Sequence, residues 1–401
     1  MKSVYYGWWL VAGLFVVLTV SSGFGFYNLS VYMNVFARTH GFAISDISVA
    51  VSLFFVVGGI TGIWVARLLD QFDVRLIMII GAIVAGLALG VTGSVTSLWQ
   101  LYLLFTLFGI GNTGVSIIVS TTLVTRWFPG RNRSVALSIA STGLSMGGVV
   151  LTPASAKILS HYALDQVMPW FGLAFFVLIA PIAWWIVKDR PSDADLHRTR
   201  QTADPGPLWT YSQAVRNRFF ILLTAAYVLC MGSQVGGISH LYNRVYELIG
   251  ASEAAWAVQA LTIMSITGRF VGGWLVTLVP IRTFTLINAA GQVGGLTLVG
   301  SATSTTQVLV GAGLFGASMG NLLMLQPLWL AEAFGIRAYA RIFSVSNAVT
   351  VAGVAGGPIL LGVLYDLQGY NFAYLTAASI SVVALILMSL AGAGPGPNQH
   401  R

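Results

Sequence analysis

Charged residues are scarce in this sequence, because Asp, Glu, Lys and Arg together make up only 8% of the 401 residues. An average soluble domain carries about 25% charged residues, so this chain lacks the polar surface that a soluble protein of its length needs. Hydrophobic residues make up 56% of the chain. This composition excludes a soluble globular protein and predicts a membrane protein that crosses the bilayer several times.

Cysteine is almost absent as well, since Cys230 is the only one in the chain. A single cysteine excludes an internal disulfide, and no cluster of His, Cys and Asp has the spacing of a metal site. The Gly-rich stretches lack the Gly-Lys-Ser or Gly-Lys-Thr of a nucleotide-binding loop, and no catalytic triad has a suitable setting. We therefore expect no metal, no cofactor, no enzymatic activity and no ATP-driven pump.

Long apolar runs are what the sequence has instead. Twelve runs are each long enough to cross a hydrocarbon core of about 30 Å as a helix. They cover residues 8–31, 46–66, 76–95, 98–124, 134–157, 167–187, 219–242, 253–276, 283–302, 306–331, 341–364 and 371–392. They are continuous rather than alternating, which disfavours a β-barrel. The sequence thus predicts an all-α polytopic membrane protein with twelve transmembrane helices.

A polar stretch between the sixth and seventh runs divides the chain into two halves. Residues 188–218 contain three prolines and charges of both signs, which is typical of a linker. We expect an N-terminal six-helix bundle over 1–187 and a C-terminal six-helix bundle over 219–392. A short tail then covers 393–401.

The distribution of Lys and Arg predicts the orientation in the membrane. If both termini are cytoplasmic, sixteen of the twenty basic residues lie on the inner side, which agrees with the positive-inside rule. The formal charge of +8 then reflects topology, so we expect the lipid bilayer rather than nucleic acid as a partner. We predict a monomeric, multi-pass protein of the cytoplasmic membrane with both termini in the cytoplasm.

The two halves of the chain repeat one another. With a constant shift of 207 residues, the stretch 45–75 aligns with 252–282. In this alignment Asp46 meets Glu253, and Arg75 meets Arg282. A parallel repeat of two six-helix bundles is one architecture that carriers use for alternating access.

One charge interrupts the apolar run at 253–276. Arg269 is the only charged residue between Ala254 and Ile281, and its counterpart in the repeat is Gly62. An arginine at membrane depth costs about 3 kcal/mol on insertion scales, and it cannot lose its proton. No acid lies at mid-depth in the predicted spans, so we predict that Arg269 binds a carboxylate with its planar guanidinium. The alternative is that Arg269 snorkels to the cytoplasmic surface.

Several short motifs resemble the major facilitator superfamily. Residues 66–75, ARLLDQFDVR, resemble its inter-helix motif G-x-L-a-D-r-x-G-r-R through Asp70 and Arg75, and the copy in the second half keeps Arg282. Residues 126–148, and Arg269 followed by glycines, resemble the monocarboxylate and oxalate–formate carriers of this superfamily. The resemblance implies the major facilitator fold, with Asp70, Arg75 and Arg282 in a cytoplasmic gating motif.

In that fold the first, fourth, seventh and tenth spans line the cavity, so their polar side chains are candidates for substrate binding. Asn112, Ser116 and Ser120 recur at the spacing of one helix face. The predicted substrate-binding residues are Arg269, Asn28, Tyr27, Asn112, Ser116, Tyr227, Gln234, Ser265, Asn321 and Asn347. Ser265 stands one turn before Arg269, where eukaryotic relatives carry an acid. For the Ser and Asn residues, the alternative is a hydrogen bond between helices.

Three ionisable residues are candidates for proton coupling. His240 lies near the outer end of the seventh run and belongs to the residue type that titrates near physiological pH; an interfacial histidine without this role is the alternative. Asp46 and Glu253 begin the second and eighth runs. Their alternative role is to complement the helix dipole behind N-caps at Ser45 and Ser252.

These features predict a secondary active transporter for a small organic anion, with a monocarboxylate favoured. Its partner is then a small-molecule carboxylate, and transport by alternating access is either proton-coupled or an exchange. An exporter of drugs or metabolites with the same fold is the alternative. A transporter-like sensor without transport is an alternative from a different class.

Overall fold

The computed structural model describes residues 5–128, 132–189, 209–276, 278–335 and 339–395, and within these ranges it is helical without any β-strand. The chain divides into two compact units, Met1–Thr202 and Ala203–Arg401, here called unit 1 and unit 2. The division falls inside the predicted linker. Most of that linker, residues 190–208, and the end of the predicted tail, residues 396–401, lie outside the described residues.

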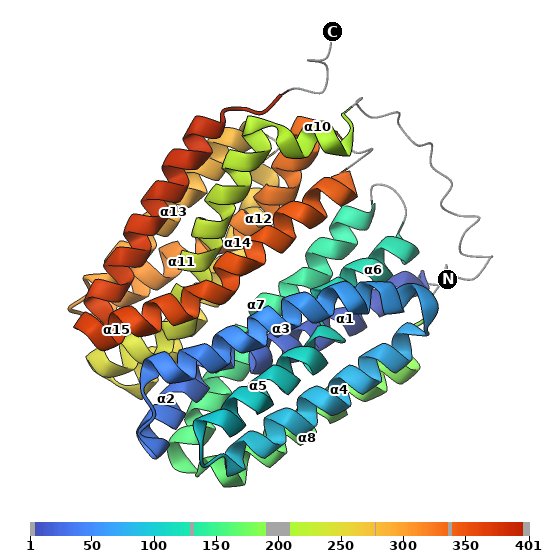
Figure 1. Ribbon diagram of the computed structural model, residues 1–401. Coiled ribbons are helices and arrows are strands. Elements are labelled where there is room, and N and C mark those ends of the chain that lie inside the picture. The colour runs from blue at the N-terminus through green and yellow to red at the C-terminus, as the bar shows by residue number, and fades with distance from the viewer. Residues whose placement is uncertain (1–4, 129–131, 190–208, 277, 336–338, 396–401) are drawn as a thin grey trace. The chain divides into compact units, whose positions relative to one another are not determined.

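Unit 1 consists of helices that lie alongside one another (Figure 1). Helices α1 and α7, α3 and α5, and α4 and α8 pack as pairs, and α4 also packs on α5. The elements are α1 (Tyr6–Ser22), the π-helical turn η1 (Gly23–Tyr27), α2 (Asn28–His40), α3 (Ile44–Gln71), α4 (Val74–Val91), the 3₁₀ turn η2 (Thr92–Ser94), α5 (Leu98–Thr113), α6 (Ile117–Trp127), α7 (Asn132–His161) and α8 (Leu164–Trp185).

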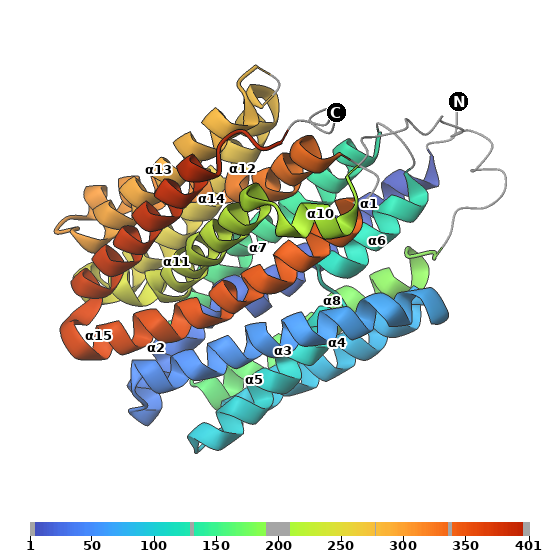
Figure 2. The same ribbon diagram turned by 45° about the horizontal axis from the view of Figure 1, so that its top comes forward.

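Unit 2 repeats this arrangement of helix pairs. Helix α11 packs on α15, α12 packs on α14, and α13 packs on both α14 and α15, as Figure 2 shows from a second direction. The elements are α10 (Tyr211–Arg216), α11 (Arg218–Ile249), α12 (Ala251–Leu275), α13 (Ile281–Gly300), α14 (Thr305–Phe334) and α15 (Tyr339–Ala391). Helix α10 lies within the segment predicted to be a linker.

Ten helical stretches among the described residues are long and apolar enough to cross a membrane. The last of them, Ile342–Ala391, covers two predicted runs, because the backbone turns at Gly369 with φ at 78°. Helix α13 covers a further predicted run, but it carries the buried Asn288 and Gln292 and is therefore less apolar than the ten. Helices thus occupy all twelve predicted runs.

The repeat between the halves extends to the packing of the helices. Gly109 of α5 lies so close to α3 that a Cβ would be 2.5 Å from the carbonyl oxygen of Phe54. Gly316 of α14 lies even closer to the carbonyl oxygen of Leu261 in α12. The shift of 207 residues relates both pairs. The same two helix surfaces therefore meet in each unit, and only glycine permits the contact.

The helices α5 and α14 also begin with related caps. At the start of α5 the Ser97 backbone N–H donates to Oε1 of Gln100 at 3.3 Å, and at the start of α14 Oγ of Ser304 accepts from the Gln307 backbone N–H at 3.3 Å. Such caps satisfy backbone N–H groups that have no partner inside the helix. The shift of 207 residues relates Ser97 to Ser304 and Gln100 to Gln307, so the repeat also preserves where these helices begin.

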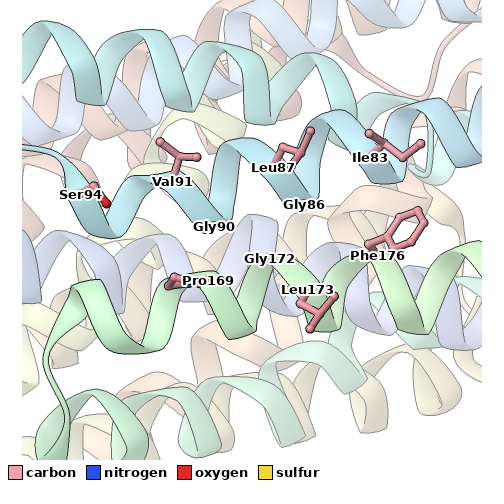
Figure 3. A pocket seen from close by; sticks show the side chains of 10 residues that line it. All are labelled: Ile83, Gly86, Leu87, Gly90, Val91, Ser94, Pro169, Gly172, Leu173 and Phe176. Atoms are coloured by element: carbon pink, nitrogen blue, oxygen red, sulfur yellow. The ribbon is translucent and has the colours of Figure 1, made fainter.

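A groove runs along the line where α4 and α8 meet in unit 1 (Figure 3). The two helices approach closely at Gly86, where a Cβ would lie 2.7 Å from the carbonyl oxygen of Gly172. Side chains such as Leu87 and Leu173 border the groove, and Ser94 is the only polar side chain that lines it. The groove offers no charged side chain for an anion among the residues that line it.

Candidate functional site

Arg269 is buried in the seam between α12 and α14. Its residue surface is 8% exposed, and its Nε donates a hydrogen bond to the carbonyl oxygen of Gly320 at 3.3 Å. A Cβ on Gly320 would lie 3.0 Å from Cγ of Arg269 and 2.9 Å from Oγ of Ser265. A glycine is therefore needed at 320 to give the arginine its path across α14.

The direction of the Arg269 side chain bears on the snorkelling alternative. Gly320 contacts both Arg269 and Ser265, and Ser265 lies one turn toward the N-terminus of α12, away from its end at Leu275. Gly320 also precedes the end of α14 at Phe334 by 14 residues, which is about 21 Å of helix. This geometry favours a position inside the span over snorkelling toward the end of α12.

In the equivalent seam of unit 1, between α3 and α5, the larger side chain comes from the other helix of the pair. The shift of 207 residues relates Arg269 to Gly62 and Gly320 to Thr113. The Thr113 hydroxyl donates to the carbonyl oxygen of Gly58 at 3.2 Å and occupies the seam from the α5 side. Unit 1 thus shows that this pair of helices packs without an arginine.

A second difference between the units lies at the neighbouring position, where a pair of asparagines in unit 2 corresponds to a pair of glycines in unit 1. Asn321 of α14 donates from Nδ2 to Oδ1 of Asn288 in α13 at 2.9 Å. Their counterparts in unit 1, Gly114 and Gly81, meet directly, with a Cβ on Gly81 at 3.0 Å from Cα of Gly114. The bond links two helices, which is the alternative role for the predicted site residue Asn321. Its buried Oδ1 has no hydrogen-bond partner among the described residues.

Three further predicted site residues of unit 2 lie in different surroundings. Tyr227 is fully buried and donates from Oη to the carbonyl oxygen of Leu322 at 3.2 Å. Gln234 is buried as well, and its Oε1 has no hydrogen-bond partner in the part of the chain that the structure describes. Asn347 is exposed, whereas its neighbour Ser346 is buried. The binding role of these three residues stays a prediction.

In unit 1 the predicted residues Tyr27 and Asn28 lie at the end of the π-helical turn η1. Asn28 is fully buried and donates from Nδ2 to Oγ of Ser155 at 2.7 Å and to Oη of Tyr32 at 3.3 Å. Tyr27 is buried, and its ring meets the ring of Phe26 edge-on. Asn28 thus links α2 to α7, while its Oδ1 has no hydrogen-bond partner among the residues described.

The fourth predicted run is broken rather than continuous. Helix α5 ends at Thr113 and α6 begins at Ile117. Ser116 is the N-cap of α6, and its Oγ accepts from the Ile118 backbone N–H at 3.3 Å. The predicted single helix face with Asn112, Ser116 and Ser120 is therefore wrong, because the helix restarts between the first two. The signal in the sequence was Gly114 beside polar residues, a pattern that favours a turn.

The predicted gating residues hold the ends of helices. Arg75 donates from Nε to the Val187 carbonyl oxygen at 2.7 Å, just beyond α8. Arg282, its counterpart in the repeat, donates from Nη2 to the Ser389 carbonyl oxygen at 3.2 Å, near the end of α15. The side chain of Asp70 lies outside what the structure describes. The repeat thus preserves an arginine that binds the end of the sixth span of its unit.

Sequence reasoning missed Arg126 at the same end of unit 1. Its Nη1 forms an ion pair with Asp189, and its Nη2 donates to the Leu69 carbonyl oxygen at 2.7 Å. Arg126 therefore ties α6 to the end of α3 and to the start of the linker. Its place in the last turn of α6 was the available signal, since basic residues there bind exposed carbonyl groups.

His240 is fully buried between α11 and α15, and α11 continues beyond it to Ile249, past the predicted end at 242. Its Nε2 donates to the Pro358 carbonyl oxygen at 3.0 Å, and its Nδ1 lies 3.4 Å from Oη of Tyr370. His240 thus connects a proline-containing stretch of α15 to α11, and its proton coupling stays a prediction.

Asp46 and Glu253 both lie in the first turn of their helices, as expected. The predicted N-caps at Ser45 and Ser252 are wrong, because α3 begins at Ile44 and α12 begins at Ala251. Each helix starts earlier than the polar residues suggested. The two carboxylates still complement the positive ends of the helix dipoles, and a role in proton coupling stays a prediction for both.

A second buried arginine, Arg244, was not among the predicted site residues. It is 7% exposed and donates to three carbonyl oxygens at the end of α13, those of Val299 at 3.2 Å, Gly300 at 3.0 Å and Ala302 at 3.1 Å. The last carbonyl groups of a helix have no partner inside it. Arg244 therefore has a structural role as the cap of α13.

Comparisons with known proteins agree with this architecture. The family model described as the Major Facilitator Superfamily matches residues 15–320. Monocarboxylate transporter 13 of Rattus norvegicus is 26% identical over 310 residues, which are 76% of this chain and 70% of that protein.

Two solved structures are similar in fold. One is a bacterial homologue of the human lysosomal transporter Spinster, with a TM-score of 0.73, 16% identity and 97% of each chain covered. The other is the nucleoside transporter NupG, with a TM-score of 0.76, 12% identity, and coverage of 96% of this chain and 100% of that one.

Proposed function

The chain belongs to the major facilitator superfamily of transporters, and we propose that it is a secondary carrier of a small organic anion, with a monocarboxylate favoured. The observation that carries the proposal is the α12–α14 seam, which is shaped around Arg269. Gly320 provides the path for the side chain and a carbonyl oxygen that orients Nε. The guanidinium would bind a carboxylate, because its planar fork suits two parallel hydrogen bonds to the two carboxylate oxygens.

Comparison of the two units supports a functional reason for this arginine. The equivalent seam of unit 1 packs with Gly62 and Thr113 and has no charge. A seam of this kind therefore does not require an arginine for packing, whereas a charge inside a span costs about 3 kcal/mol. A bound anion would lower that cost. The name of the rat relative, a monocarboxylate transporter, points to the same class of substrate.

The coupling of transport has two forms under this proposal. In the first, a proton enters with the anion, and His240, Asp46 or Glu253 is the group that binds it. In the second, one anion is exchanged for another. A pH gradient drives uptake in the first case, and an internal anion drives it in the second.

A thermal-shift screen of the purified protein tests the proposed substrate class. A ligand that binds only the folded protein raises the free energy of unfolding by RT ln(1 + [L]/Kd), which is about 2.7 kcal/mol when the ligand concentration is 100 times Kd. We expect straight-chain monocarboxylates to raise the unfolding temperature of the wild type, whereas the corresponding uncharged amides do not. Arg269→Ala should lose the response. A wild type that responds to no carboxylate would count against the proposal.

The control for this screen is Gly273→Ala. A Cβ added at Gly273 would have no atom of a neighbouring described residue within 4 Å. Gly273 also lies on the same helix as Arg269. This variant should respond to carboxylates as the wild type does. Loss of the response in the control as well would show that any change in α12 disturbs binding, which would remove the evidence for a direct role of Arg269.

A further inference from the structure

A buried polar cluster in unit 2 connects α11 to both halves of α15. His240 is fully buried, and its Nε2 donates to the carbonyl oxygen of Pro358 at 3.0 Å. Its Nδ1 lies 3.4 Å from Oη of Tyr370. Pro358 precedes the turn at Gly369, whereas Tyr370 follows it. The histidine therefore contacts both of the predicted spans that α15 covers.

The hydrogen bond to Pro358 determines which nitrogen of His240 carries a proton. A carbonyl oxygen only accepts, so Nε2 is protonated. In the neutral imidazole Nδ1 is then an acceptor, and the Tyr370 hydroxyl is the donor beside it. A second proton would bind at Nδ1, and the Tyr370 hydroxyl would rotate so that its oxygen accepts. The hydroxyl hydrogen of Tyr370 would then need a new acceptor.

Asn243 offers such an acceptor. It is 2% exposed, and its side chain lies next to the Tyr370 hydroxyl. Neither its Oδ1 nor its Nδ2 forms a hydrogen bond of ordinary geometry with the described residues. A buried amide in this condition costs free energy and calls for an explanation. A second protonation state supplies one, because Oδ1 of Asn243 would accept from the Tyr370 hydroxyl once His240 is charged.

A carboxylate connects these buried groups to the surface of unit 2. The ring of Tyr365 lies against the ring of Tyr370, with the two centroids 4.1 Å apart. The Tyr365 hydroxyl donates to Oε1 of Glu247 at 2.6 Å. Glu247 is exposed, so it exchanges protons with water. Two tyrosines thus separate His240 from a group that takes protons from solution.

The charged groups around His240 bear on whether a second proton can bind there. Arg244, one turn further along α11, opposes a positive charge, although the backbone carbonyl groups at the end of α13 bind its guanidinium. Glu247 of α11 and Asp366 of α15 favour a positive charge in the same region. Glu253 of α12 follows beyond the end of α11. Two nearby carboxylates therefore compensate for the one arginine.

We propose that His240, Tyr370 and Asn243, which we call the proton cluster, bind the proton that accompanies the transported anion. Ionisable side chains inside spans commonly belong to proton pathways, and histidine is the residue type that titrates near physiological pH. The proton enters from solution by way of Glu247, binds at Nδ1 of His240, and returns to solution when the carrier releases the anion. This inference rests on the proposed function, and it selects the proton-coupled form with His240 as the proton-binding group.

The replacement His240→Gln tests proton binding separately from packing. Glutamine offers a donor for the Pro358 carbonyl oxygen and an acceptor for the Tyr370 hydroxyl, but it does not bind a proton. Tyr374→Phe is the matched control in the same pair of helices. It removes a hydroxyl that donates to the Gly237 carbonyl oxygen at 2.6 Å, and it leaves the proton cluster intact.

The assay compares two modes of transport in proteoliposomes, with labelled glycolate and labelled pentanoate as probes and protein-free vesicles as the baseline. In the first mode, a pH gradient with the acid side outside drives uptake into empty vesicles. In the second mode, vesicles loaded with the unlabelled probe exchange it at equal pH. A gradient of about one pH unit is a tenfold difference in proton concentration, so it should accelerate uptake by wild type and Tyr374→Phe by up to about tenfold. His240→Gln should show no acceleration, but it should exchange as the wild type does, because exchange moves no net proton.

Three results would overturn the inference while the proposed function stands. They are a wild type that exchanges but does not respond to the gradient, a His240→Gln variant that the gradient accelerates as it does the wild type, and a folded His240→Gln variant that loses both modes. The last would show that the role of His240 is structural. A wild type that performs neither mode with either probe would defeat the proposed function and this inference with it. If His240→Gln does not fold, Tyr370→Phe gives the same test, because it removes the oxygen that accepts from charged His240.

Discussion

The replacement Gly320→Ala tests the geometry of the Arg269 site without touching the arginine. The new Cβ would lie 3.0 Å from Cγ of Arg269 and 2.9 Å from Oγ of Ser265, and closer still to the Ser265 backbone oxygen. Ordinary van der Waals contact begins at 3.4 Å, so α12 and α14 have to separate. We expect the variant to lose both stability and carboxylate binding.

The size of the effect follows from three contributions. Overpacking of a tight contact costs about 1–3 kcal/mol, and weakening the hydrogen bond from Arg269 to Gly320 costs about 1–2 kcal/mol. The higher helix propensity of alanine offsets about 1 kcal/mol. The free energy of unfolding should therefore fall by about 1–4 kcal/mol. Gly313→Ala is the control on the same helix, since its Cβ would lie at an ordinary 3.4 Å from Met264.

The single cysteine provides the assay. Cys230 is 1% exposed and is the only thiol in the chain, so a thiol-reactive fluorophore reports unfolding as the temperature rises. Gly320→Ala should react at a lower temperature than the wild type, whereas Gly313→Ala should react at the same temperature or slightly above it. Equal midpoints for all three proteins would refute the close contact between Gly320 and Arg269.

Three further predictions concern stability; those in unit 2 are measured by the same Cys230 labelling, and the one in unit 1 is measured by scanning calorimetry. Arg244→Ala should lower the free energy of unfolding by about 2–4 kcal/mol, because three carbonyl oxygens lose a charged donor; an unchanged midpoint would contradict its role as a cap. Gly172→Ala should destabilise unit 1 by about 1–3 kcal/mol, because the Cβ collides with the backbone of α4. Gly90→Ala is the control and should leave the stability of unit 1 unchanged, because its Cβ would lie 3.6 Å from the nearest atom. Equal destabilisation by the two variants would refute the close packing of α4 on α8 at Gly172. Ser304→Ala should cost about 1 kcal/mol through loss of the α14 cap, and no loss would show that this cap is not needed.

Much of the fold could be predicted because it follows from composition. Runs of apolar residues longer than a bilayer leave few structures other than helices, and helices occupy all twelve predicted runs. The interruptions could not be predicted in the same way. The break at residues 114–116 and the π-helical turn at Gly23–Tyr27 depend on which backbone groups neighbouring helices can satisfy. A chain with 45 glycines offers too many positions for such interruptions.

The candidate site was partly accessible from the sequence. Arg269 could be identified because a charge inside a span is costly and its counterpart in the repeat is a glycine. The role of Gly320 could not be predicted, because it depends on contacts that Gly320 in α14 makes with Ser265 and Arg269 in α12. Arg244 was missed because its partners are backbone carbonyl groups, which carry no sequence signal. The burial of His240 was not visible in the sequence, because its partners, Tyr370 and the Pro358 carbonyl oxygen, lie more than a hundred residues further along the chain.

Uptake of a labelled monocarboxylate into proteoliposomes tests the central claim most directly. The assay compares the wild type, Arg269→Ala, Arg269→Lys and the control Gly273→Ala at equal amounts of folded protein. We predict that the wild type and the control accumulate substrate, whereas uptake by Arg269→Ala falls by at least about thirtyfold, as expected for loss of a buried charge pair worth about 2 kcal/mol or more. Uptake by Arg269→Lys should also be lost, because an ammonium group cannot form the two parallel hydrogen bonds of a guanidinium. Full uptake by Arg269→Ala would contradict the account.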